Sequence, residues 1–392
     1  MKLLTLTSLY PNAVHGNHGV FVENRLRHLS ASGDVTCRVV APVPWFPSTH
    51  AAFGRYAQYA RVPRSETRHG IQVDHPRFLQ IPKIGMAPSP YLMAAALKPV
   101  IEKILADGYD FDLIDSHYFF PDGVAAVMLG EYFNKPVVVT ARGSDISVLT
   151  THALPRRLIL RAAAKADGLI TVCQALKTAM VELGVPDERI VTLRNGVDLT
   201  LFQPVERAIA RARLGLSQYT LLAVGRLTEA KGQALIIEAL TSLPDVRLLL
   251  AGSGPDRDAL QRLAQELGVQ SRVTFLGDVA HAELRNTYNA ADALVLASSR
   301  EGWANVLLEA MACGTPVIAS RVWGTPEVVR GPDAGLLLEQ RTAAGIAAAV
   351  QALRARPPAR TATRRYAEQF SWDATSRGQT ALFEHILEGR TP

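Results

Sequence analysis

The amino-acid sequence predicts an α/β protein built from two Rossmann-like, doubly wound domains that face a central cleft. Three observations predict this class. Short apolar runs alternate with helical patterns along the chain, which is typical of buried parallel strands and their crossover helices. The pattern restarts near residues 194–204. The chain has 392 residues, too many for one ordinary hydrophobic core.

The first domain is expected over residues 1–195. Right-handed crossovers between its strands should place helices on both faces of the sheet. The segment 43–70 is aromatic and basic, and it is too long for an ordinary connection, so we expect it to be functional or mobile. The strands are predicted at residues 2–8, 35–41, 112–118, 136–141, 168–173 and 189–195.

The second domain is expected over residues 196–365, after the turn signal Asn195-Gly196. A helical tail over residues 366–392 should cross back to the first domain. Open α/β sheets bind ligands at the carboxyl ends of their strands, so the site is expected there. The strands are predicted at residues 219–225, 246–252, 272–278, 292–298 and 315–320.

Composition narrows the class of protein. With 48% hydrophobic and 20% charged residues, the chain is neither disordered nor fibrous. Three widely spaced cysteines argue against a disulfide framework and a structural zinc site, and they favour the cytoplasm. No apolar run approaches the roughly 20 residues that cross a bilayer. The net charge of +6 favours an anionic partner, but no zinc finger or RNA-recognition signature favours nucleic acid.

The stretch "VGRLTEAKGQALIIEAL" follows a predicted strand and opens a helix. Gly225 allows the chain to turn, and Arg226 and Lys231 bring two cations to that turn. Gly232 stands near the helix start, where free N–H groups and the helix dipole favour an anion. A diphosphate would fit this loop, although a solvated charged loop is the alternative.

The stretch "SSREGWANVLLEAMACGTP" repeats this arrangement. Glu301 and Gly302 lie in the loop before a helix that begins near Asn305, and Glu309 lies one turn further along the same face. A carboxylate at Glu309 is suited to accept both hydroxyls of a ribose. Backbone N–H groups are expected to form a second anion cradle at Ala304, Asn305 and Val306.

Five motifs in order resemble the retaining glycosyltransferases of family 4, the group 1 glycosyltransferases with the GT-B fold. The resemblance spans nearly the whole second half of the chain, and its two glutamates, Glu301 and Glu309, match the acidic motif of that family. The motifs are "NGVD…F" from residue 195, "VGRLTEAKG" from 224, "AGSGP" from 251, "VTFLGDV" from 273 and "EGWANVLLEAMACGTPVIAS" from 301.

The resemblance implies a role for each matching position. Arg226 and Lys231 would neutralise a nucleotide diphosphate, Glu309 would hold its ribose, and Glu301 would contact the donor sugar. The backbone from Gly302 through Trp303 to Val306 would line the pocket. Neither a metal nor a cofactor is implied, because cations and helix dipoles take the place of a metal in this fold. The Asp-x-Asp at residues 110–112 precedes a strand and is interpreted as structural.

The resemblance is looser in the first half. His117, in "SHYFFPDG", occupies the place where relatives carry a histidine beside the donor sugar, and a core histidine with its hydrogen bonds satisfied is the alternative. In "TARGSDI", Arg142 replaces the histidine of a common "HGSD" pattern. Asp145 either orients an acceptor hydroxyl or caps the next helix, and Ser144 lies beside it. Gly19, which directly precedes a helix, is the better candidate for a phosphate contact in the first loop.

The implied activity is metal-independent, retaining transfer of a hexosyl or N-acetylhexosaminyl group from a nucleotide sugar, favoured as a UDP-sugar, to a glycan or lipid-linked acceptor. The product would be used in polysaccharide or glycolipid assembly.

One face of a predicted helix is basic, since it carries Arg157, Arg161 and Lys165. This helical face is either exposed to solvent or bound to the inner, cytoplasmic surface of an anionic membrane.

The main alternative function is that of a non-catalytic sugar-nucleotide-binding subunit. A dinucleotide-dependent oxidoreductase would need a G-x-G-x-x-G that the chain lacks.

Overall fold

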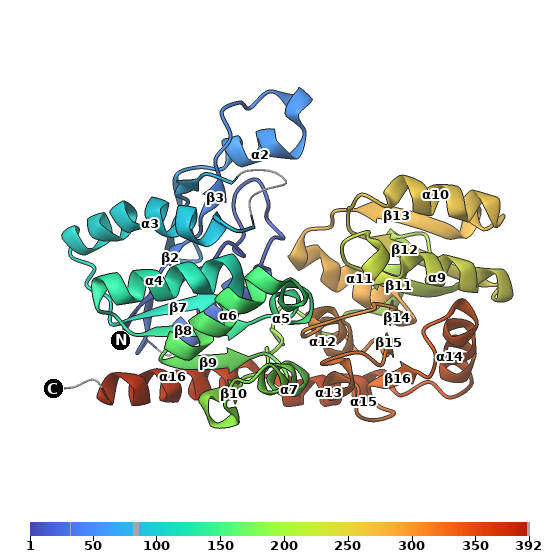
Figure 1. Cartoon of the computed structure of the whole chain (residues 1–392). Coiled ribbons are helices and arrows are strands. Elements are labelled where there is room, and N and C mark those ends of the chain that lie inside the picture. Colours follow the sequence, from blue (N-terminus) through green and yellow to red (C-terminus); the bar gives the residue numbers. More distant parts are fainter. Residues whose placement is uncertain (32, 81–85, 390–392) are drawn as a thin grey trace. The chain divides into compact units, whose positions relative to one another are not determined.

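The computed structural model describes residues 1–31, 33–80 and 86–389. The chain forms two compact units (Figure 1). Unit 1 comprises Met1–Arg194 and Asp373–Pro392, and unit 2 comprises Asn195–Trp372. The C-terminal helix starts at Trp372, later than the expected residue 366, because Ser371 is extended. No helix among the described residues is long and apolar enough to span a membrane.

Unit 1 is built on an eight-stranded sheet with the order β10-β9-β8-β7-β1-β2-β5-β4. All neighbours pair in parallel except β4 and β5. A separate short pair joins β3 to β6. The strands are β1 Lys2–Leu6, β2 Thr36–Val40, β3 Val43–Pro44, β4 Ser65–Arg68, β5 Ile71–Asp74, β6 Arg77–Phe78, β7 Leu113–His117, β8 Val137–Ala141, β9 Gly168–Thr171 and β10 Ile190–Thr192.

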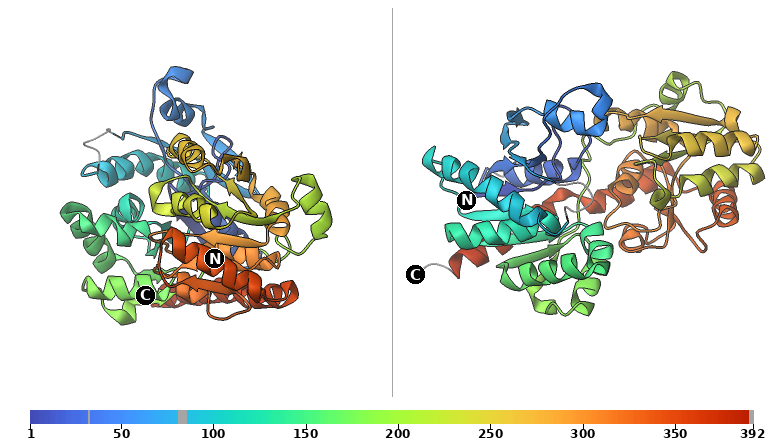
Figure 2. Two further views of the ribbon diagram at one scale, coloured as in Figure 1. Left: turned by 90° about the vertical axis from the view of Figure 1, so that its right-hand side faces the viewer. Right: turned by 45° about the horizontal axis from the view of Figure 1, so that its top comes forward.

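Helices cover both faces of this sheet. On one face, α1 and α16 contribute Leu26 and Phe383 to a core with Leu3, Leu113 and Val138. On the other, α4 packs so closely on β8 that a Cβ at Gly130 would lie 2.2 Å from the Val137 side chain. Helix α2 projects from the rest of the unit at the top of Figure 1 and of the left view of Figure 2. The helices are α1 Val20–Ser30, α2 Arg55–Arg61, α3 Ser89–Ala106, α4 Val124–Phe133, α5 Ser144–Ser147, α6 Ala153–Lys165, α7 Gln174–Glu182 and α16 Trp372–Glu388.

Unit 2 contains a six-stranded parallel sheet with the order β13-β12-β11-β14-β15-β16. Its apolar strands pack against helices on both faces. The strands are β11 Tyr219–Val224, β12 Val246–Ala251, β13 Val273–Gly277, β14 Ala293–Leu296, β15 Val317–Ser320 and β16 Gly335–Leu338. The helices are α8 Arg207–Arg213, α9 Gln233–Ala239, α10 Arg257–Glu266, α11 Leu284–Ala290, α12 Asn305–Ala312, α13 Thr325–Val328, α14 Ala343–Ala355 and α15 Arg360–Ala367.

Each sheet has one point at which the winding direction reverses. In unit 1 the chain passes from β1 to β2 on one side, and β7 lies on the other side of β1. In unit 2 it passes from β11 to β12 and β13, and then β14 returns to the other side of β11. Loops diverge at such a switch point and leave a crevice at the carboxyl ends of the strands. The doubly wound α/β architecture expected from the sequence is confirmed.

Candidate functional site

In unit 2, the loops that follow β11 and β14 meet at the switch point. The Ser299 N–H donates to the Ala230 carbonyl at 2.8 Å. Gly232 adopts a left-handed φ of 70°, and a Cβ there would come within 2.2 Å of the Ala297 carbonyl oxygen. Only glycine fits this conformation and this close approach without strain. The two motifs identified in the sequence are therefore held against each other.

This contact pairs Lys231 with Glu301. Lys231 Nζ donates to Glu301 Oε1 at 2.5 Å, and the Ser298 hydroxyl donates to the same oxygen at 2.6 Å. The side chains are 30% and 11% exposed, respectively, so the pair remains accessible. Arg226 is also exposed, and its carbonyl accepts from the Gln233 amide. The structure thus joins two residues that the sequence assigned to different parts of a ligand.

Glu309 lies in the middle of α12, one turn after its first residue, and is buried. Its Oε1 lies 2.9 Å from His281 Nε2, and its Oε2 accepts from the Tyr288 hydroxyl at 2.7 Å. Burial, reinforced by the Glu309 carboxylate, raises the pKa of Tyr288 well above its usual value. Phe202 packs edge-on against both aromatic partners. Glu309 is therefore held rigidly, with lone pairs left for further hydrogen bonds.

His281 and Tyr288 were not predicted from the sequence. His281 follows a strand, which is a weak signal, whereas Tyr288 is indistinguishable from an ordinary core residue of a helix. Their link to Glu309 depends on how α11 and the turn at residues 281–283 before it pack against α12, and no local sequence pattern indicates that packing.

The start of α12 differs in part from the expected anion cradle. The N–H of Asn305 donates to the Trp303 carbonyl at 3.2 Å, so this amide is already engaged. The Asn305 side-chain oxygen accepts from the amide of Asn195, which belongs to the "NGVD" motif. Trp303 is buried beside Phe370, and Gly302 precedes it in the loop. The Asn305 N–H is thus engaged within the loop, and the anion cradle at Ala304, Asn305 and Val306 stays a prediction.

In unit 1, the β1–α1 loop is fixed at both ends. Gly19 caps α1 with a left-handed φ of 71°, and a Cβ there would lie 2.3 Å from the Leu9 carbonyl. Gly16 has open space around it. The Ser8 N–H and hydroxyl both donate to the buried carboxyl of Asp122, which follows β7. Burial raises the pKa of Asp122 to about 7.

His117 ends β7 and is completely buried. Its Nδ1 lies 2.7 Å from an Arg142 guanidinium nitrogen, and its Nε2 lies 3.2 Å from an Asp115 oxygen. Burial lowers the pKa of His117 to about 4, and Arg142 acts in the same direction, against the opposing effect of Asp115. The ring that was expected beside a donor sugar thus faces two side chains of its own unit.

Asp145 lies in the first turn of α5, whose N-cap is Gly143. Its carboxylate accepts from the N–H groups of Phe119, Arg142 and Gly143, at distances between 2.7 and 3.1 Å. These contacts hold the backbone before α5 and are not those of a helix N-cap, and the contact of Asp145 with an acceptor hydroxyl stays a prediction. The Ser144 hydroxyl is engaged with the Tyr118 hydroxyl at 2.8 Å.

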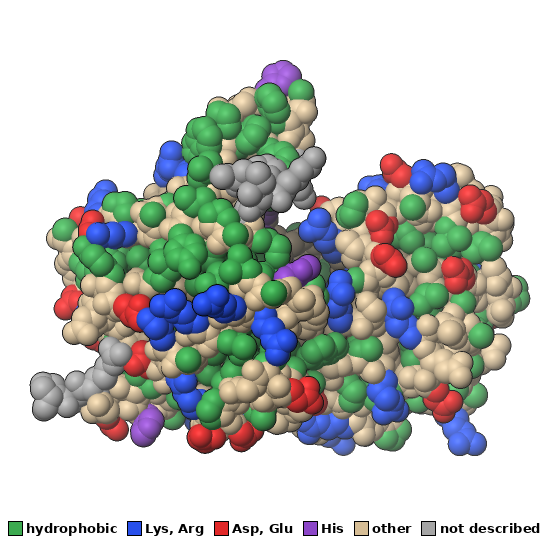
Figure 3. Space-filling view, viewed as in Figure 1, with side chains coloured by type: hydrophobic (Ala, Val, Ile, Leu, Met, Phe, Trp, Pro, Cys, Tyr) green, Lys and Arg blue, Asp and Glu red, His purple; other side chains and the backbone are tan. Residues whose placement is uncertain are grey.

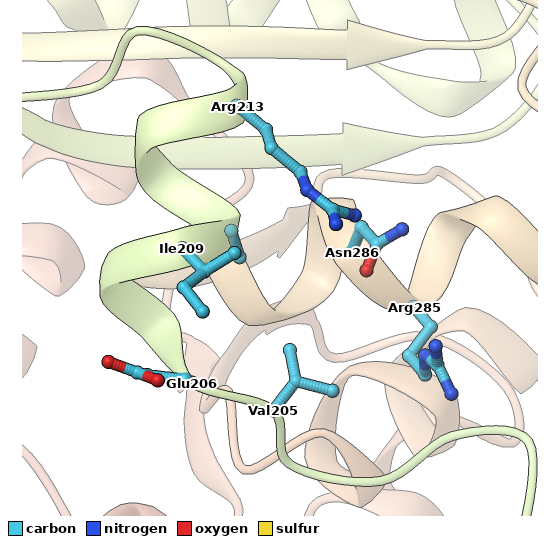
Figure 4. Close-up of a pocket in the computed structure, with 7 residues that line it drawn as sticks. Val205, Glu206, Ile209, Arg213, Arg285 and Asn286 are labelled. Carbon is cyan, nitrogen blue, oxygen red and sulfur yellow. The ribbon is translucent and has the colours of Figure 1, made fainter.

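The Asp-x-Asp at residues 110–112 and the pocket between α8 and α11 both lie away from the predicted site residues. Asp110 pairs with Lys135, and Asp112 accepts from the Lys2 N–H, so both groups have structural partners. Within the described ranges, no group of three or more His, Cys, Asp or Glu side chains could hold a metal ion. A pocket of about 160 Å³ opens between α8 and α11, but none of the predicted site residues lines it (Figure 4).

Comparisons with known proteins identify the family of the chain. The family model of glycosyl transferases group 1 matches residues 206–370, and that of glycosyltransferase family 4 matches residues 18–201. The D-inositol 3-phosphate glycosyltransferase of Mycobacterium tuberculosis is 32% identical over 312 residues, which cover 73% of this chain. The match spans 64% of that relative's length.

Solved structures share the fold. Sucrose-phosphate synthase from Thermosynechococcus elongatus superposes with a TM-score of 0.82 at 24% identity and covers 99% of both chains. Anabaena HepE in complex with UDP has a TM-score of 0.73 at 22% identity, covering 98% of this chain and 100% of that one. These likenesses identify the GT-B fold. Together with the two family matches, which span most of the sequence, they show that the chain belongs to the group 1 glycosyltransferases.

Proposed function

We propose that the protein transfers a sugar, with retention of configuration, from a nucleotide-diphosphate donor to an acceptor hydroxyl. The observation that carries the proposal is the accessible Lys231–Glu301 pair at the switch point of unit 2. A departing diphosphate needs fixed positive charge, and sugar hydroxyls need acceptors. UDP is the favoured nucleotide, since HepE, a structural neighbour, is described in complex with UDP and with UDP-glucose.

Each residue has a defined role in this proposal. Lys231 has three N–H donors, so it can keep Glu301 and still donate to a phosphate oxygen. The exposed Arg226 adds a second cation, and Glu301 accepts from hydroxyls of the donor sugar. Glu309, held by its two partners, accepts from the ribose. These cations would make a metal unnecessary, and no cofactor takes part.

The test combines binding with turnover. A thermal-shift panel of UDP-, GDP- and ADP-sugars should show stabilisation by one nucleotide class, because a ligand of the native state raises apparent stability. Lys231→Ala and Glu301→Gln should each lower kcat at least about 100-fold. A chelator should leave the wild-type rate unchanged, and the anomeric configuration of the product can be determined by NMR.

Arg354→Ala provides a matched control. Arg354 forms a surface ion pair with Asp245, which directly precedes β12. The pair therefore lies at the amino end of that strand, whereas the candidate site lies at the carboxyl ends of the strands in the same sheet. Its removal should leave turnover within about twofold. Wild-type rates in the Lys231 and Glu301 variants would overturn the site assignment. Tight nucleotide binding without transfer to any acceptor in a broad panel would favour the non-catalytic binding subunit.

For the acceptor we propose a glycan or lipid-linked hydroxyl used in polysaccharide or glycolipid assembly at an anionic membrane surface. A groove of about 220 Å³ between α3, α4 and α6 has an apolar lining that includes Val124, Val127 and Leu158. Arg161 and Lys165 also line this groove, although Lys165 is paired with Glu131. Figure 3 also shows apolar side chains over the projecting α2 segment. Apolar area beside cations is typical of surfaces that bind anionic lipid.

A further inference from the structure

The strand β7 places two ionisable side chains on one face of its sheet. Side chains alternate along a strand, so Asp115 and His117 point to the same side as Leu113. That side carries the core formed with α1 and α16. Both side chains are 0% exposed. His117 therefore lies within unit 1, where the hydrogen bonds to its ring determine its chemistry.

The two partners of the ring fix its protonation. Arg142 has only donors, so the His117 Nδ1 at 2.7 Å must accept and carries no proton. The proton of the neutral ring then lies on Nε2, which faces Asp115 at 3.2 Å. Proton uptake at Nδ1 would break the bond to Arg142 and place two cations against each other. The lowered pKa of His117 agrees with this arrangement.

Further side chains hold Asp115 in place. The Gln379 amide of α16 donates to Asp115 Oδ2 at 3.1 Å, and Arg25 Nε of α1 donates to the Gln379 oxygen at 2.8 Å. His117 and the two arginines keep the pKa of Asp115 below its usual value despite burial. A continuous chain of polar contacts thus runs from the C-terminal helix through Asp115 to His117 and Arg142.

Arg142 is the end of this chain. Its backbone N–H is fixed by Asp145, and its guanidinium lies 5.3 Å from the centre of the Phe21 ring on the first turn of α1. Arg142 is 9% exposed, whereas His117 is sealed. It follows the carboxyl end of β8, the edge at which parallel sheets bind ligands.

We propose that His117 is a positioning residue that orients Arg142, and that it does not move a proton in the reaction. This inference rests on the proposed transferase function. Asp115 and Gln379 support it by holding the ring in its Nε2-protonated form. Arg142 is then the side chain through which this part of unit 1 acts on a bound substrate.

The kinetic test separates accepting a hydrogen bond from transferring a proton. His117→Asn places an amide oxygen close to the position of Nδ1, whereas His117→Leu has no acceptor. His117→Leu should lower kcat/KM about as much as Arg142→Met, and the double variant should lie within about twofold of Arg142→Met, because both changes break one contact. His117→Asn should restore kcat/KM to within about fivefold of the wild type.

Histidine-selective ¹⁵N NMR of the full chain provides a readout that does not need activity. The His117 signal, assigned by its loss in His117→Asn, should show a neutral ring protonated on Nε2 from pH 5.5 to 9. The proposal would be overturned by three results together: the His117 signal titrates between pH 6 and 8, the wild-type pH–rate profile shows a matching step, and the His117→Asn enzyme is inactive. If His117→Leu does not fold, the NMR titration and the comparison of His117→Asn with Arg142→Met still decide. If the protein transfers no sugar from any donor, the proposed function is wrong. The NMR titration then still tests whether the His117 ring is neutral and protonated on Nε2.

Discussion

Replacing Asp122 by asparagine should stabilise unit 1 at neutral and higher pH. The buried Asp122 carboxyl accepts from the N–H and the hydroxyl of Ser8, and burial raises its pKa from 3.8 to about 7. An asparagine can reproduce the neutral form, because its oxygen accepts from the N–H and its amide donates to the hydroxyl. The variant therefore removes an ionisation without removing the link to the β1–α1 loop.

The sign and size of this stability difference follow from the linkage between proton binding and folding. The pKa is higher in the folded than in the unfolded protein, so the protonated carboxyl contributes stability that is complete below about pH 4 and is lost as pH rises through about 7. The difference between 3.8 and about 7 corresponds to at most about 4 kcal/mol. Asp122→Asn should match the wild type near pH 4 and exceed its free energy of unfolding by up to about 4 kcal/mol at pH 8.

Hydrogen exchange measured by mass spectrometry on peptides from β1 and β7 reports unit 1 separately from unit 2. The free energy of opening should be compared between the two proteins from pH 4.5 to 8. Asp110→Asn is the control, because Lys135 lowers the pKa of that exposed carboxyl and its pH dependence has the opposite sign. A constant difference between Asp122→Asn and the wild type at every pH would refute the reasoning.

Three further outcomes can be measured directly. Gly19→Ala should lower the free energy of unfolding by about 1–3 kcal/mol in urea titrations, because its φ is left-handed and the added Cβ would clash with Leu9, whereas Gly16→Ala should change it by less than about 0.5 kcal/mol. Tyr288→Phe removes one donor to Glu309 and should weaken nucleotide binding about 5–10-fold by calorimetry, with equal affinity refuting the proposed ribose contact. Arg161→Glu should reduce co-sedimentation with vesicles containing anionic lipid and leave neutral vesicles unaffected, and equal binding in both proteins would contradict the proposed membrane surface.

The sequence predicted the parts of the fold that depend on local pattern. Buried parallel strands are continuous apolar runs, so β1, β7 and β11 could be located before the structure was known. The strands β3, β4, β5, β6 and β16 were missed. β4 is the charged edge segment "SETR", and charge at an edge is how sheets avoid further pairing, so the strand resembles a loop.

The candidate site could be predicted only as far as its own motifs extend. Lys231 and Glu301 follow strands that are neighbours in a doubly wound sheet, so their meeting is a consequence of topology. The contacts of His117 could not be predicted in this way, because they involve residues far apart in the sequence. The chain behind it includes Arg25 and Gln379, which are 354 positions apart, and no local periodicity records such a contact.

The two switch points place charged residues alike but expose them differently. In unit 2, Lys231 and Glu301 remain open, so their charges are available to a ligand. In unit 1, the corresponding edge ends in a sealed chain in which His117 lies between Arg142 and Asp115. A buried charge held between such partners is costly to move, so the chain favours rigidity over proton transfer. If the transfer depends on stabilising a departing diphosphate, unit 2 carries that charge, and unit 1 contributes a fixed Arg142 whose orientation depends on a histidine that stays neutral.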